Sequence, residues 1–145
     1  MKWKILAVGK PSLAYAKAGM EEYLGRLRRY TPVEFAPIKD GRPEDISDAL
    51  WKGSEDGIRI LLDERGELWS TEDLRKRVDK WELDRVRQVN WLIGPAHGHR
   101  EEDRKRATAV VALSRFTLQH EMALVVLLEQ IYRVYTLKKG EPYHR

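Results

Sequence analysis

Short apolar runs recur along the 145-residue chain, and segments with apolar residues at every third or fourth position separate them. A short apolar run bounded by turn residues is typical of a buried strand. The first run, residues 3–8, is closed by Gly9-Lys10-Pro11, which favours a turn. We therefore expect strands at residues 3–8, 33–38, 58–63 and 89–94 and a further strand inside residues 110–118, with a turn at residues 64–68.

The segments between these runs have helical periodicity. Ser70 stands before a stretch that has acidic residues in its first turn, which is typical of a helix start. The last helix is apolar all round between Met122 and Leu128, so Met122 and Leu124 are expected to be buried. The predicted helices cover residues 12–30, 46–51, 70–81, 100–107 and 120–137.

The alternation of strands and helices predicts the fold class. Successive βαβ units give an α/β fold with a mostly parallel sheet and helices on both faces. No linker, repeat or low-complexity tract divides the sequence, so residues 1–145 are expected to form one domain. Ligands of such sheets bind beyond the carboxyl ends of the strands. This rule points to the loops after Leu62, Ile93 and Leu113.

Composition narrows the function classes without choosing one. Lys and Arg number 27 against 23 Asp and Glu, and the net charge of +4 permits an anionic partner without requiring one. The absence of cysteine excludes disulfides, thiolate metal sites and a cysteine nucleophile. The longest uncharged apolar run, Met122 to Leu128, is far shorter than a membrane span, and the first apolar run is too short for a signal peptide. We expect a cytoplasmic protein with no membrane partner.

The segment GPAHGH, residues 94–99, follows a predicted buried strand. Its glycines would let the backbone approach a ligand, although a plain strand-to-helix turn explains them as well. The segment is neither a dinucleotide fingerprint nor a phosphate loop. His97 and His99 would point the same way on an extended segment and could share a cation, but nothing in the sequence supplies the remaining ligands.

Two further segments carry candidate chemistry. Residues 113–118 lead into the last helix, whose N-terminus would favour a carboxylate or phosphate, or would simply be capped by Thr117. Within that helix, Glu129 and Arg133 are one turn apart and can pair. The chain then closes on Tyr143, His144 and Arg145, which either fray or contribute to a site.

Several stretches, taken in order, carry a family resemblance. They are AVGK at 7–10, EYL at 22–24, LLDERG at 61–66, LIG at 92–94, ALS at 112–114, TL at 117–118, His120, EQIYR at 129–133 and PYHR at 142–145. In this order and spacing they resemble the small SPOUT-class methyltransferases that methylate N3 of a pseudouridine in the large-subunit (23S) ribosomal RNA. The likeness covers essentially the whole chain.

The resemblance implies a C-terminal trefoil knot, a homodimer and S-adenosylmethionine as cofactor. It implies a substrate nucleotide in the helix 69 loop of 23S rRNA, presented by the large subunit or the assembled ribosome. Side chains at the end of the chain would be catalytic, with His144 as the candidate general base and Tyr143 and Arg145 beside it. Arg133, Glu129 and His120 would contact the substrate. The implied cofactor-binding residues are Leu62, Gly94, Leu113, Ser114, Arg115, Phe116, Thr117 and Leu118, and no metal is implied.

Two positions depart from the family pattern. Pro95 stands where relatives carry a second glycine and lacks an amide N–H, and Gln119 stands where the family often has proline. Two other hypotheses stay open. One is a non-catalytic RNA-binding or ribosome assembly factor of the same fold. The other is a metal-dependent hydrolase that uses His97 and His99.

Overall fold

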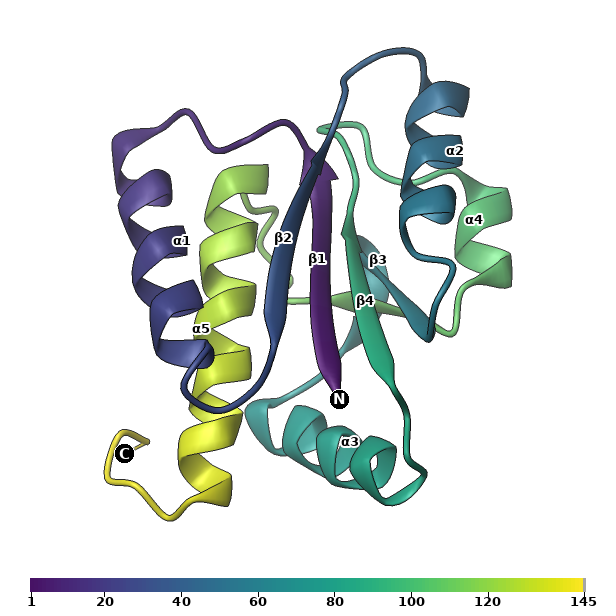
Figure 1. The fold of residues 1–145 in the computed structure, drawn as a ribbon. Coiled ribbons are helices and arrows are strands. Elements are labelled where there is room, and N and C mark those ends of the chain that lie inside the picture. Colours follow the sequence, from purple (N-terminus) through teal and green to yellow (C-terminus); the bar gives the residue numbers. More distant parts are fainter. Residues whose placement is uncertain (145) are drawn as a thin grey trace.

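The computed structural model describes residues 1–144 and places their strands in one parallel sheet (Figure 1). The strand order is β2-β1-β4-β3-β5. Because neighbouring strands are parallel, the chain crosses back to the starting end of the sheet before each new strand begins. The parallel register brings the carboxyl ends of the central strands to one edge, for example by pairing Leu62 with Ile93. The strands are β1 (Lys2–Val8), β2 (Val33–Ile38), β3 (Ile58–Leu68), β4 (Gln88–Ile93) and β5 (Ala109–Ala112).

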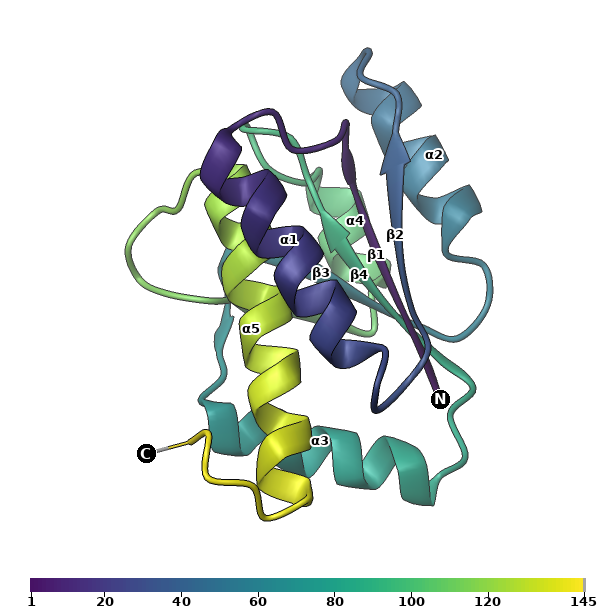
Figure 2. The same ribbon diagram turned by 60° about the vertical axis from the view of Figure 1, so that its left-hand side comes forward.

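Helices cover both faces of the sheet, as Figures 1 and 2 show from two sides. The helices are α1 (Ala14–Leu27), α2 (Pro43–Gly53), α3 (Thr71–Leu83), α4 (Glu101–Arg106) and α5 (His120–Lys138). Alternate side chains of a strand point to opposite faces. Trp3 and Ile5 of β1 therefore pack with α1, α3 and α5, whereas Leu6 packs with α2. The predicted α/β class with a parallel sheet and helices on both faces is confirmed.

Two sequence predictions fail in detail. β3 continues to Leu68 instead of turning after Asp63, because Glu67 and Leu68 pair with β5 after a register shift. Gly66 allows this close approach, since a Cβ at that position would lie 2.5 Å from the Val110 backbone. Met122 was predicted to be buried but is 39 % exposed. It lies on the side of the first turn of α5 that faces away from the core, whereas Leu124 lies on the side that faces the core.

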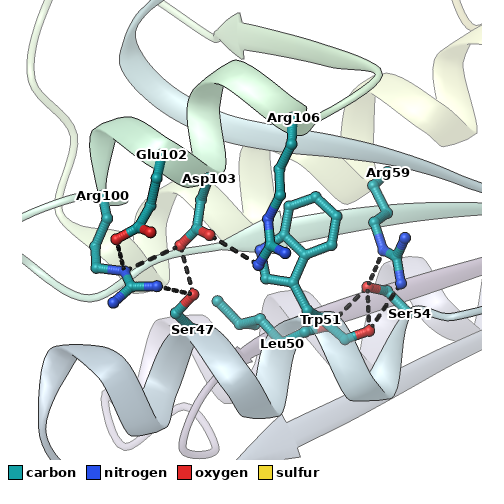
Figure 3. A network of polar contacts seen from close by, with 9 residues as sticks. All are labelled: Ser47, Leu50, Trp51, Ser54, Arg59, Arg100, Glu102, Asp103 and Arg106. Atoms are coloured by element: carbon teal, nitrogen blue, oxygen red, sulfur yellow. Dashed lines mark hydrogen bonds and ion pairs between the residues drawn. The ribbon is translucent and has the colours of Figure 1, made fainter.

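The buried carboxylate of Asp103 links α4 to α2 (Figure 3). Asp103 accepts a hydrogen bond from Ser47 Oγ at 2.6 Å and pairs with Arg106 at 3.1 Å and with Arg100 at 3.5 Å. Burial opposes its ionisation, but the hydrogen bonds from Ser47 and Arg106 hold the pKa of Asp103 below its ordinary value. The loop between β4 and α4 is thus tied down at its far end.

The guanidinium of Arg106 also lies 3.8 Å from the ring centre of Trp51, which adds a cation–π contact between α4 and α2 (Figure 3).

Within residues 1–144, the helices are too short or too polar to cross a membrane.

Candidate active site

A cavity of about 480 Å³ lies beyond the carboxyl ends of β4 and β5 and beside the segment of β3 after Leu62, where the pairing of β3 with β5 is interrupted. Three loops build it: residues 62–65 after the regular part of β3, residues 93–98 after β4, and residues 113–120 between β5 and α5. These are the loops that the strand-end rule singled out. Its volume falls in the range of about 300 to 1,000 Å³ that small-molecule sites occupy. The predicted cofactor residues line this cavity, except for Arg115, which is exposed.

Asp63 holds two of the three loops together. Its side chain is 1 % exposed, and it accepts hydrogen bonds from the backbone N–H of Arg65 at 2.9 Å and of His99 at 3.2 Å. Arg65 and Arg104 add ion pairs at 3.7 and 4.0 Å. A buried carboxylate with two backbone donors fixes the loops that carry them. Sequence reasoning missed this role, although an acid at the end of a buried apolar run is a signal that could have suggested it.

Glu64 joins the first loop to the third. Thr117 Oγ1 donates to Glu64 Oε2 at 2.6 Å, and both side chains are exposed at the cavity. The Ser114 side chain accepts from the backbone N–H of Phe116 at 2.9 Å, which shapes the turn of the third loop. Phe116 lines the cavity yet is 83 % exposed, so a large apolar ring stands at its mouth. Glu64 did not appear among the sequence candidates.

Gln119, and not Thr117, caps the last helix. The Gln119 side chain accepts from the backbone N–H groups of Glu121 and Met122 at 2.9 and 3.0 Å. The proposed capping role of Thr117 was therefore wrong, because its hydroxyl is turned toward Glu64. Two of the backbone N–H groups at the N-terminus of α5 therefore already donate to Gln119, and fewer remain to bind an anion there. His120 follows as the first helical residue and lines the cavity.

The two histidines of the second loop have separate environments. The ring of His99 is buried, and its Nε2 donates to the Leu92 carbonyl at 2.8 Å. Burial lowers the pKa of His99 from its ordinary value. His97 lines the cavity instead. Among the residues that the structure describes, no three histidine, aspartate or glutamate side chains are placed to hold a metal ion.

The end of the chain packs against the C-terminal half of α5. Glu129 Oε1 accepts from Arg133 Nη2 at 2.6 Å, which confirms their predicted pairing, and also from the Tyr143 hydroxyl at 3.1 Å. The Tyr143 ring meets Tyr132 edge-on, with ring centres 4.8 Å apart. Arg133 Nη1 lies 3.0 Å from His144 Nδ1. Arg145, the remaining catalytic candidate, lies outside the described residues.

These candidates fall into two groups at opposite ends of α5. His120 is at the cavity, whereas Glu129 and Arg133 hold the tail nine and thirteen positions later in the sequence. At 1.5 Å of rise per residue, Arg133 lies roughly 20 Å along the helix from His120. Figure 1 shows the same separation, with the start of α5 and the final residues at opposite ends of the helix. Within one chain, the tail and the cavity are therefore apart.

A parallel α/β sheet with a cavity of small-molecule size at its strand ends defines a class of α/β domain whose ligands bind at that edge. The family described as "Predicted SPOUT methyltransferase" matches residues 1–144 of this chain. The chain is also 46 % identical over 145 residues to "Ribosomal RNA large subunit methyltransferase H" of Thermus thermophilus, covering 100 % of this chain and 99 % of the relative.

Proteins of the same name from two other bacteria are similar over nearly their full lengths. The Geobacter metallireducens protein is 39 % identical over 152 residues, covering 99 % of each chain, and the Deinococcus radiodurans protein is 37 % identical over 145 residues, covering 100 % of this chain and 99 % of the relative. The chain belongs to the SPOUT methyltransferase family. The family resemblance seen in the sequence is thus confirmed.

Proposed function

We propose that this protein transfers a methyl group from S-adenosylmethionine to N3 of a pseudouridine in the helix 69 loop of 23S ribosomal RNA, within the large subunit or the assembled ribosome. The cavity at the three strand-end loops is the observation that carries the proposal, because it is where this class of sheet binds a cofactor. The names of the full-length relatives support ribosomal RNA of the large subunit as the substrate.

The residues of the cavity fit the cofactor. S-adenosylmethionine carries an activated methyl group on a sulfonium, so the protein has mainly to bind it and align the acceptor. Gly94 lines the cavity, and a Cβ at this position would lie 3.1 Å from the buried His99 ring, so a glycine lets the second loop fold over that ring. Phe116 offers an apolar ring at the mouth. Glu64 offers a carboxylate to a cofactor that carries two positive groups. Pro95 supplies no N–H, and other backbone groups of the loops remain for the adenosine.

The catalytic tail is proposed to come from a second copy of the chain. Tyr143 and His144 are held roughly 20 Å along α5 from the start of the helix, so their own cavity is out of reach. Exposed apolar side chains border the cavity end of α5: Tyr15, which hydrogen-bonds to Gln119 at 3.3 Å, together with Leu13 and Met122. A homodimer in which the C-terminal end of the partner's α5 covers this surface would bring one subunit's tail to the other's cavity.

Nucleoside mass spectrometry of ribosomal RNA from cells with and without this protein tests the reaction. Loss of a methylated pseudouridine on deletion, and its return on complementation, is the expected result. A variant that lacks residues 143–145 should bind S-adenosylmethionine normally in calorimetry but should not restore the modification. Normal RNA modification by that variant would remove the tail from the site. RNA binding without cofactor binding would favour the assembly-factor reading that Pro95 encourages.

A further inference from the structure

The hydrogen bond between Arg133 and His144 determines which ring nitrogen of His144 carries the proton. Arg133 Nη1 lies 3.0 Å from Nδ1 of His144. A guanidinium has only donors and stays charged, so Nδ1 must be the acceptor in this bond. A neutral imidazole that accepts at Nδ1 carries its hydrogen on Nε2.

The guanidinium that imposes this state is itself held in place. Glu129 Oε1 accepts from Arg133 Nε at 3.0 Å and from Nη2 at 2.6 Å, and these two side chains are 18 and 24 % exposed. The Tyr143 ring lies 4.9 Å from the guanidinium carbon, and its hydroxyl donates to the same carboxylate oxygen. The carboxylate and the ring therefore leave Nη1 directed at His144, whose side chain is exposed and accessible to a substrate.

We propose that His144 serves methyl transfer as a hydrogen-bond donor through Nε2–H and not as the general base, with Glu129 and Arg133 as positioning residues. The inference rests on the proposed function. All four side chains belong to one chain, so the cluster keeps its geometry when the tail reaches a partner's cavity. It replaces the general-base role that the sequence suggested for His144.

The donor role fits the chemistry of an imide nitrogen. The N3 proton passes to a water molecule, the N3 electron pair forms the new N–CH₃ bond, and the electron pair of the breaking S–CH₃ bond stays on sulfur. Negative charge develops on the carbonyl oxygens that flank N3 as its proton leaves. A donor already placed at such an oxygen stabilises the transition state without reorganising. His144 Nε2–H is that donor in the proposal.

Nuclear magnetic resonance tests the tautomer directly. Long-range ¹⁵N–¹H correlation spectra of the full-length ¹⁵N-labelled protein, with His144 assigned from the His144→Gln variant, distinguish a protonated from an unprotonated ring nitrogen. We expect neutral His144 to have Nε2 protonated and Nδ1 unprotonated. The Arg133→Met variant should show both tautomers in exchange, because the donor to Nδ1 is gone. Protonated Nδ1 in the unsubstituted protein would overturn the proposal.

Single-turnover methyl transfer at saturating cofactor tests the chemical role. Glutamine can place an N–H donor near the position of Nε2 but has no basic nitrogen. His144→Ala should slow transfer by about 10²- to 10³-fold, the usual loss for one transition-state donor, whereas His144→Gln should stay within about tenfold of the unsubstituted protein. A glutamine variant as slow as the alanine variant would refute the donor role.

The proposed function can fail separately from this inference. Unsubstituted protein that neither binds S-adenosylmethionine in calorimetry nor methylates ribosomal RNA would refute the function, whatever the tautomer of His144. Unsubstituted protein that methylates normally, combined with equal defects in the alanine and glutamine variants, would refute only the donor role. Unchanged cofactor affinity in both variants is the control that the cavity has been left intact.

Discussion

Replacing Asp63 by asparagine tests whether this buried carboxylate holds the cavity loops together. One carboxylate oxygen accepts from the Arg65 N–H at 2.9 Å and the other from the His99 N–H at 3.2 Å. Asparagine has the same shape but presents one oxygen and one NH₂ group. In either orientation, one backbone N–H then faces an NH₂ group and loses its acceptor.

The expected destabilisation follows from these contacts. A buried donor left without a partner costs about 1 to 3 kcal/mol. The ion pair with Arg65 spans 3.7 Å and its guanidinium side is 54 % exposed, so solvent screening limits its loss to about 1 kcal/mol or less. We expect the free energy of unfolding to fall by about 2 kcal/mol, which at a typical urea dependence of about 2 kcal/mol per molar lowers the midpoint by about 1 M.

Urea unfolding followed by tryptophan fluorescence measures the effect, with Asp48→Asn as the matched control. Asp48 is exposed on α2, so the same chemical change should alter stability by less than about 0.5 kcal/mol. Calorimetry should also show weaker binding of S-adenosylmethionine to the Asp63 variant, because its loops must be ordered on binding. If that ordering costs about 1.4 kcal/mol of binding free energy, the affinity falls about tenfold. Equal midpoints for the two variants would refute the role assigned to Asp63.

Further substitutions test other contacts. Glu64→Gln should weaken S-adenosylmethionine binding by up to about fivefold in calorimetry but leave uncharged 5′-methylthioadenosine unaffected; equal losses would contradict a charge effect. Tyr135→Phe removes the hydroxyl that accepts from buried Trp3 Nε1 at 2.7 Å and should cost about 1 to 3 kcal/mol in urea unfolding. The hydrogen bond from the Leu13 backbone N–H, together with that from the Ser12 N–H, lowers the pKa of Glu121. The stabilisation by the Glu121 carboxylate therefore exists above the ordinary glutamate pKa and is lost as pH falls through the lowered value. The stability gap between unsubstituted protein and Glu121→Gln should therefore narrow below about pH 4, and a constant gap would contradict this reasoning.

Features that depend on neighbouring residues could be predicted from the sequence. Ser70 caps α3 as expected, since the capping box joins it to Asp73 only three positions away. Apolar runs located the central strands, because a strand buried on both faces needs continuous apolar residues. Parallel connections then placed Leu62, Gly94 and Leu113 at one edge, where the cavity lies. The trefoil knot stays a prediction of the family resemblance, because local pattern carries no information on threading.

Contacts between distant residues were decided only by the tertiary structure. The extension of β3 to Leu68 depends on pairing with β5, more than forty residues later in the chain. Asp63 became a link between loops because the fold brings the His99 N–H to it. The sequence determined where strands and helices form and which residue types meet the strand ends, because these follow from local periodicity. Which donor meets which acceptor, including the Arg133 bond that sets the proton on His144, depends on distances that only the folded chain defines.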